Sequence, residues 1–89
     1  MGRRPARKDR AWQYKTPLYR RVVERLRRNV IYYRHEHGWT QEQAAHHCKM
    51  PVRSYQDVEL GVTNATMTTV ARLCQGLDVD VAQLFEPRR

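Results

Sequence analysis

Residues 40–61, TQEQAAHHCKMPVRSYQDVELG, decide the fold of this chain, because they encode two short helices with a tight turn between them. Thr40 and Gln43 fit a capping box, in which each residue's side chain bonds to the backbone of the other at a helix start. This pattern predicts a first short helix that runs from Thr40 to about Cys48.

The second short helix follows at once. Lys49 and Met50 are left for the tight turn, and Pro51 suits the opening of a helix because its backbone angle is already helical. Gly61 marks the end after Leu60, since glycine readily takes the left-handed conformation of a helix cap. The sequence therefore predicts a second helix over about 51–60.

Two short helices cannot bury their own apolar faces, so the flanking residues must cover them. Pro17 suits a first helical turn, and Gly38 supplies a stop, which predicts a long helix over about 18–37. Its apolar side chains recur every three or four residues, the spacing of a buried helical stripe. They are Tyr19, Val22, Leu26, Val30 and Tyr33, widened by Val23 and Ile31.

The rest of the chain is predicted to be helical as well. Thr66 can cap a helix that reaches Leu77, and Asp78 or Asp80 can cap a last short helix over 81–85. No stretch alternates apolar and polar residues for long, so no strand is predicted. The expected fold is all-α: a compact five-helix domain over 18–86 whose first helix extends beyond the N-terminal side of the core.

The charge is uneven along the chain. Seventeen Lys and Arg stand against nine Asp and Glu, a net charge of +8. Eleven of the seventeen lie within the first 28 residues, and residues 1–17 are predicted to be a basic, largely disordered arm. Such an excess implies a polyanionic partner, most commonly nucleic acid, although charge alone also allows a membrane surface or an acidic protein.

From about Leu26 to Phe85 the chain resembles the XRE family of lambda-repressor-like helix-turn-helix domains. Elements typical of the family occur in order at the right distances. They are Tyr33-Arg34, Gly38-Trp39-Thr40-Gln41-Glu42, Ala45, Val58-Glu59-Leu60-Gly61, Cys74-Gln75-Gly76-Leu77-Asp78-Val79 and Leu84-Phe85. The chain departs from the family at the turn, where Lys49 replaces glycine, and at Pro51, where a Ser or Thr cap is usual.

The resemblance implies a sequence-specific DNA-binding transcriptional regulator, a repressor with the helix around 51–60 in the major groove of double-stranded DNA. If Tyr55 and Val58 face inward, the remaining side chains of this helix face the bases. The resemblance places the base-reading positions at Val52, Arg53, Gln56 and Asp57. It also implies a buried salt bridge between Arg34 and Glu59.

Other polar residues are expected to hold the DNA backbone. The set comprises Thr40, Gln41, Ser54, Thr63, Asn64 and Thr66. The basic arm either contacts DNA, as the arms of related repressors do, or is a solubilising tail, and the sequence leaves both open. Its candidate residues are Arg3, Arg4, Arg7, Lys8 and Arg10.

A unit this small reads few base pairs, so we expect a homodimer on a palindromic operator. Candidates for the subunit interface are Val81, Leu84 and Phe85 in the last helix, or the extension of the first helix. The main alternative is a module of the same fold that binds RNA or protein, such as an antitoxin-type partner-binding protein, because fold alone does not decide between these functions.

Other classes of function find little support. The histidines and Cys48 are spaced so that none share a helix face, which favours surface histidines and a core cysteine over a metal site; the histidines are His35, His37, His46 and His47. No GxSxG motif, glycine-rich phosphate loop or acidic pair suggests an enzyme, and no cofactor or small-molecule ligand is expected. Without a signal peptide, a CxxC pair or a membrane-length apolar run, a cytoplasmic location is expected.

Overall fold

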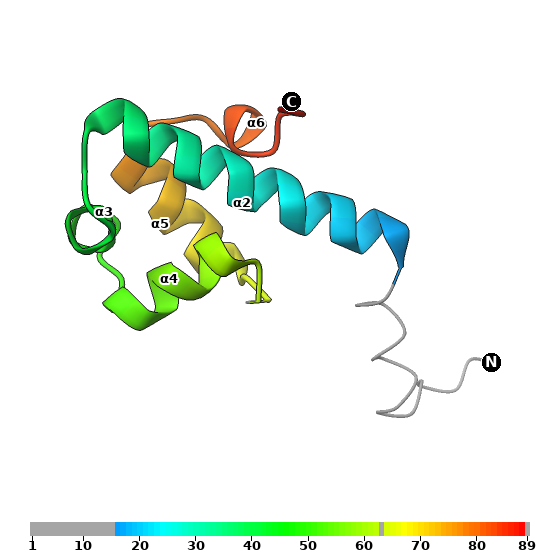
Figure 1. The fold of residues 1–89 in the computed structure, drawn as a ribbon, viewed down its shortest axis with the longest axis horizontal. Coiled ribbons are helices and arrows are strands. Elements are labelled where there is room, and N and C mark those ends of the chain that lie inside the picture. Colours follow the sequence, from blue (N-terminus) through cyan, green and yellow to red (C-terminus); the bar gives the residue numbers. More distant parts are fainter. Residues whose placement is uncertain (1–15, 63, 89) are drawn as a thin grey trace.

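The computed structural model describes residues 16–62 and 64–88, which form five helices and no strand. The helices are α2 (Pro17–His37), α3 (Gln41–His47), α4 (Val52–Leu60), α5 (Met67–Leu77) and α6 (Val81–Leu84). In Figure 1, α2 runs along the molecule with α4 below it and α6 above it. The predicted all-α, five-helix fold is confirmed. None of these helices has the length and apolar character that crossing a bilayer requires.

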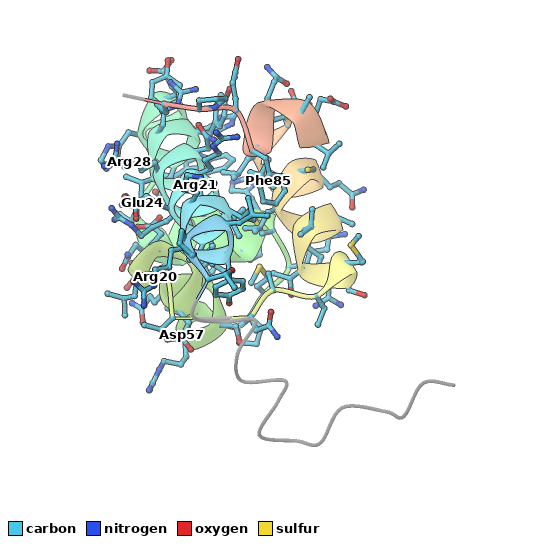
Figure 2. All side chains as sticks on the ribbon, turned by 90° about the vertical axis from the view of Figure 1, so that its right-hand side faces the viewer. Arg20, Arg21, Glu24, Arg28, Asp57 and Phe85 are labelled. Carbon is cyan, nitrogen blue, oxygen red and sulfur yellow. The ribbon has the colours of Figure 1, made fainter. Side chains whose placement is uncertain are left out.

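The long helix α2 begins one residue earlier than predicted. Its N-cap is Thr16, whose side-chain oxygen accepts a hydrogen bond of 3.1 Å from the backbone N–H of Tyr19. Pro17 occupies the first turn, and Gly38 ends the helix with φ = 73°. Figure 2 shows Arg28 on the outer side of α2, and Arg20 lower in the view, toward Asp57 of α4.

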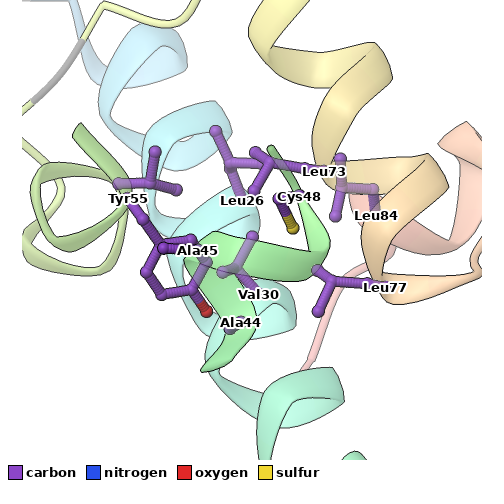
Figure 3. Close-up of a cluster of buried hydrophobic side chains, with 10 residues drawn as sticks. Leu26, Val30, Ala44, Ala45, Cys48, Tyr55, Leu73, Leu77 and Leu84 are labelled. Carbon is purple, nitrogen blue, oxygen red and sulfur yellow. The ribbon is translucent and has the colours of Figure 1, made fainter. Parts of the chain in front are cut away.

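The core lies where α2, α3, α4 and α5 meet, and Figure 3 shows its side chains. Its buried members come from every helix; they are Leu26, Val30, Ala44, Ala45, Cys48, Tyr55, Val58, Leu73, Leu77 and Leu84. Leu84 has no exposed surface even in the single chain, which removes it from the predicted subunit interface. Val81 is exposed and Phe85 half-buried, so these two remain available.

Helix α5 approaches the end of α3 closely at Gly76. A Cβ atom added there would lie 2.5 Å from the sulfur of Cys48, 2.6 Å from its Cα and 2.7 Å from its backbone nitrogen. Real Cβ atoms do not approach other heavy atoms so closely, and two of these atoms are backbone. Only glycine therefore allows α5 to pack at this distance.

A buried polar side chain ties α6 and the residues after it to α2. The amide of Asn29 donates hydrogen bonds of 2.9 Å to the carbonyl of Leu84 and 2.8 Å to that of Glu86. Its oxygen accepts a bond of 2.5 Å from Nε of Arg88, whose guanidinium lies 3.7 Å from the centre of the Tyr32 ring. Asn29 is fully buried and fully bonded, so it fixes the C-terminal segment without leaving an unpaired polar group.

Candidate nucleic-acid interface

The turn between α3 and α4 uses a lysine in a conformation that favours glycine. Lys49 has φ = 55°, which costs a residue with a side chain roughly 1–2 kcal/mol. The N–H of Met50 donates a bond of 2.9 Å to the carbonyl of Ala45, which closes the turn. Pro51 is the N-cap of α4 rather than its first residue, and it supplies no side-chain cap. The departures from the family pattern are therefore accommodated without loss of the turn.

Helix α4 has one buried and one open face, as predicted. Tyr55, Val58 and Glu59 are buried against α2 and α3. On the other side, Val52 is exposed and the side chain of Arg53 keeps 86% of its surface. The two remaining predicted base-reading residues, Gln56 and Asp57, are half-buried at the edges of this open face.

The predicted salt bridge of Arg34 and Glu59 is present, and it belongs to a larger network. Nε and Nη2 of Arg34 donate to the two carboxylate oxygens of Glu59, at 2.6 Å and 3.1 Å. The same carboxylate accepts bonds from the Tyr55 hydroxyl, at 2.5 Å, and from Nε2 of Gln41, at 2.9 Å. Four donors from α2, α3 and α4 thus converge on one buried group.

These donors determine the charge state of Glu59. Burial by itself would raise the pKa of this carboxyl, but the hydrogen bonds from Arg34, Tyr55 and Gln41 outweigh it, and the pKa is lowered. Burial also raises the pKa of the Tyr55 hydroxyl, which therefore stays a donor. The network holds α4 to the body of the domain by its buried face.

Gln41 connects this network to the open face of α4. Its side-chain oxygen accepts a bond of 3.2 Å from Nε2 of Gln56, while its nitrogen donates to Glu59. The sequence assigned Gln41 and Gln56 to different roles, one at the DNA backbone and one at the bases. The structure brings the two side chains together, so Gln41 also orients Gln56.

The other predicted backbone-contact residues that the structure describes are exposed: Thr40, Ser54, Asn64 and Thr66. Thr40 forms the predicted capping box with Gln43, and Thr66 caps α5 through the backbone N–H of Thr69. The hydroxyl of Thr40 keeps its own O–H donor for another partner, whereas the hydroxyl of Thr66 also lies 3.2 Å from that of Thr69. Thr63 and the candidates of the arm lie outside the described residues.

An aromatic stack that sequence reasoning missed lies beside the start of α3. The Trp39 ring is sandwiched between His37, at 4.0 Å, and His47, at 3.9 Å, and all three rings are nearly parallel. His37 also makes a bond of 2.8 Å from Nε2 to the carbonyl of Leu77. The sequence does not show which rings on the surface of a helix will stack. The position of Trp39 between two predicted helices was the only signal of this contact.

No three potential metal ligands cluster within residues 16–62 and 64–88. Cys48 is buried, and burial raises the pKa of its thiol to about 11. Cys74 is half-buried, at the edge of a surface groove.

Comparison with known proteins agrees with this geometry. A family model described as helix-turn-helix matches residues 30–84, which is 55 of the 89 residues. The match takes in the last eight residues of α2 and all of α3 to α6, and it leaves residues 17–29 of α2 outside. No curated protein and no solved structure matches the chain.

Proposed function

This chain belongs to the XRE family of helix-turn-helix domains, a family of DNA-binding transcription regulators, and we propose that it represses transcription by binding a palindromic operator as a homodimer. One observation carries the proposal. Tyr55 and Val58 anchor α4 in the core, so that Val52 and Arg53 stand open to solvent beside Gln56. This is the arrangement that a helix needs to enter a major groove.

The side chains on the open face suit base recognition. The guanidinium fork of Arg53 matches O6 and N7 of guanine, and the amide of Gln56 matches adenine. Val52 suits the methyl group of thymine. Asp57 either accepts from the amine of cytosine or orients Arg53, whose Nε lies 3.7 Å from its carboxylate.

Contacts to phosphates would set the register of α4 on the duplex. Gln41 opens α3, where free backbone N–H groups attract a phosphate. Thr40 and Ser54 lie at the starts of α3 and α4, and Asn64 and Thr66 lie between α4 and α5. Short polar groups at such positions hold the DNA backbone without reading its sequence.

Replacing Arg53 with alanine is expected to weaken binding to a specific duplex by about 1–3 kcal/mol, the usual contribution of one bidentate base contact. The side chain is almost fully exposed, so the melting temperature should not change. Fluorescence anisotropy with a duplex selected from a random pool measures the affinity, and Arg72→Ala on the exposed side of α5 is the control. Equal affinities for wild type and Arg53→Ala would contradict base reading.

The same assay separates DNA binding from the RNA- or protein-binding alternative. Affinity for the selected duplex should fall steeply as salt rises, because phosphate contacts release counterions. Unlabelled duplex of the selected sequence should compete far better than scrambled duplex or duplex RNA. Equal competition by RNA would overturn the proposed function.

A dimer is proposed because one subunit reads too little DNA. Helix α4 has nine residues, about 13 Å, which spans roughly four base pairs. Two subunits on half-sites about 34–36 Å apart would double that length. An apolar groove of about 630 Å³ between α5 and the start of α6 supports a subunit contact, with Met67 and Val81 exposed at its rim.

Changing both Met67 and Val81 to glutamate should weaken self-association more than about tenfold, since like charges would face each other across the two-fold axis. Both side chains are exposed, so the variant should keep its fold. Sedimentation velocity over a concentration series measures the association, and circular dichroism checks the fold. An unchanged dissociation constant would place the subunit contact elsewhere.

A further inference from the structure

The N-terminal half of α2 carries an arginine cluster that the family match does not cover. Arg21 and Arg25 are exposed, and the side chain of neither makes a hydrogen bond or ion pair with another described residue. Four residues apart on one helix, they lie on the same face. Arg28 continues this face one turn further on, so the row spans about 10 Å.

This row borders a shallow cleft between α2 and the segment after α6. The cleft has a volume of about 230 Å³, and its lining carries four arginines and one glutamate, a net charge of +3; the residues are Arg21, Glu24, Arg25, Arg28, Pro87 and Arg88. Such a volume is smaller than a typical small-molecule site. The surface therefore suits a row of anionic groups better than an enclosed ligand.

Arg28 and Arg88 are held in place by bonds within the protein before any anion binds. Glu24 accepts bonds of 2.8 Å from Arg27 and 2.6 Å from Arg28, and these bonds hold its pKa at about 2. Arg28 also donates to the carbonyl of Arg88, at 3.2 Å, and the guanidinium of Arg88 is fixed by Asn29. Side chains fixed in this way lose less entropy when they bind a partner.

The cluster points away from the DNA-reading face. Arg27 lies on the side of α2 that faces the end of α4. A Cβ atom added to Gly61, the C-cap of α4, would lie 3.3 Å from Cδ of Arg27. At about 100° per residue, Arg21 and Arg25 are turned about 120° and 160° from Arg27. Figure 2 shows the separation, with Asp57 of α4 low in the view and Arg28 high. A duplex held by α4 would have to bend sharply around the domain to reach this surface, and DNA, with a persistence length of about 50 nm, resists such bending.

We propose that the surface formed by Arg21, Arg25, Arg28 and Arg88 is a second nucleic-acid site, which binds the phosphate backbone of another DNA segment and lets the protein bridge two duplexes. The proposal rests on the proposed function of α4. All four cations are arginines. The planar forks of Arg21 and Arg25 match phosphate oxygens, and Arg28 and Arg88, already bonded to Glu24 and Asn29, add positive charge beside them. A DNA strand rises 3.4 Å per phosphate, so about three phosphates face a row of this length.

A bridging experiment tests the proposal with wild type and Arg21→Ala/Arg25→Ala. One random-sequence duplex is immobilised on beads, and the recovery of a second, fluorescent duplex is measured. Wild type should recover the fluorescent duplex, and the double variant should recover at least about fivefold less. Both should bind a short duplex selected from a random pool within about twofold of each other, because α4 is unchanged.

Arg72→Glu is the matched control, since it lowers the net charge by two, from +8 to +6, as the double variant does. It should bridge as wild type does; an equal loss in both variants would overturn the proposal in favour of a general charge effect. Bridging that survives in Arg21→Ala/Arg25→Ala but disappears in Arg53→Ala/Gln56→Ala would assign it to the α4 helices of a dimer, and would also overturn it.

The two proposals fail in different ways. If the second site is wrong, the double variant bridges normally while wild type still binds the selected duplex. If the proposed function is wrong, wild type selects no sequence from the pool. Displacement of the fluorescent duplex by polyglutamate at lower charge concentration than by DNA would indicate an acidic protein partner, and would overturn the phosphate assignment.

Discussion

Replacing Arg34 with alanine is expected to lower the free energy of unfolding by about 3–5 kcal/mol, the usual effect of removing one partner from a buried ion pair. The side chain of Glu59 is only 5% exposed, so its charge would be left without its main partner. The bonds from Tyr55 and Gln41 remain, but they come from neutral donors. Urea unfolding followed by circular dichroism measures the change.

The double variant Arg34→Ala/Glu59→Gln separates the cost of leaving a buried charge unpaired from the cost of lost packing. Removing the charge should restore part of the stability, because a neutral amide costs less to bury than an unpaired carboxylate. If Arg34→Ala costs less than about 1 kcal/mol, the pair behaves as an exposed surface bridge, and the buried network does not hold α4.

The network also predicts how stability depends on pH. The pKa of Glu59 is lower in the folded protein than the ordinary value of 4.5. Its contribution to stability is therefore fully present above about pH 4.5, and is lost as the pH falls through the folded pKa. In Arg34→Ala, burial should raise that pKa, and carboxyl NMR titration detects the reversal.

Replacing Gly76 with alanine should lower the free energy of unfolding by about 3 kcal/mol, the upper end of the range for overpacking a core. The new methyl group would lie within 2.7 Å of two backbone atoms of Cys48, so α5 has to move away from α3. Helix propensity alone has the opposite sign, because alanine in a helix interior is more stable than glycine by about 0.5–1 kcal/mol.

Because close packing and helix propensity change the stability of Gly76→Ala in opposite directions, the variant distinguishes between them. An unchanged or higher melting temperature for Gly76→Ala would mean that α5 and α3 are not so close. Gln75→Ala, at an exposed position of the same helix, is the control and should change little. Cys48→Ala/Gly76→Ala should not recover wild-type stability, because the backbone of Cys48 remains in the way.

Local patterns predicted much of the candidate site. Thr40 and Gln43 cap α3, and Thr66 caps α5, because a cap needs only residues three apart. Tyr55 and Val58 face inward, as their spacing of three predicts. The family resemblance added the ion pair of α2 and α4, which no local pattern contains.

What the sequence missed depends on residues far apart in the chain. Gly76 falls within the helix predicted to reach Leu77. An isolated glycine in a helix is a sign of close packing, but the sequence does not show which segment packs against it. Asn29 bonds to Leu84 and Glu86, which lie 55 and 57 positions further along the chain, and no local spacing rule connects such distant residues. Leu84 was expected at a subunit interface because an apolar residue looks the same whether its own chain or a partner covers it.

The order of the helices, the caps of α3 and α5 and the inward side of α4 were determined by the sequence alone, because short-range hydrogen bonds and the helical period act between residues a few positions apart. Only the tertiary structure decided that Gln41 lies between Glu59 and Gln56, and that Arg21 and Arg25 of α2 face away from α4 while Arg34 faces it. Packing brings together side chains from separate helices, and their relative directions depend on how every helix rests on the common core.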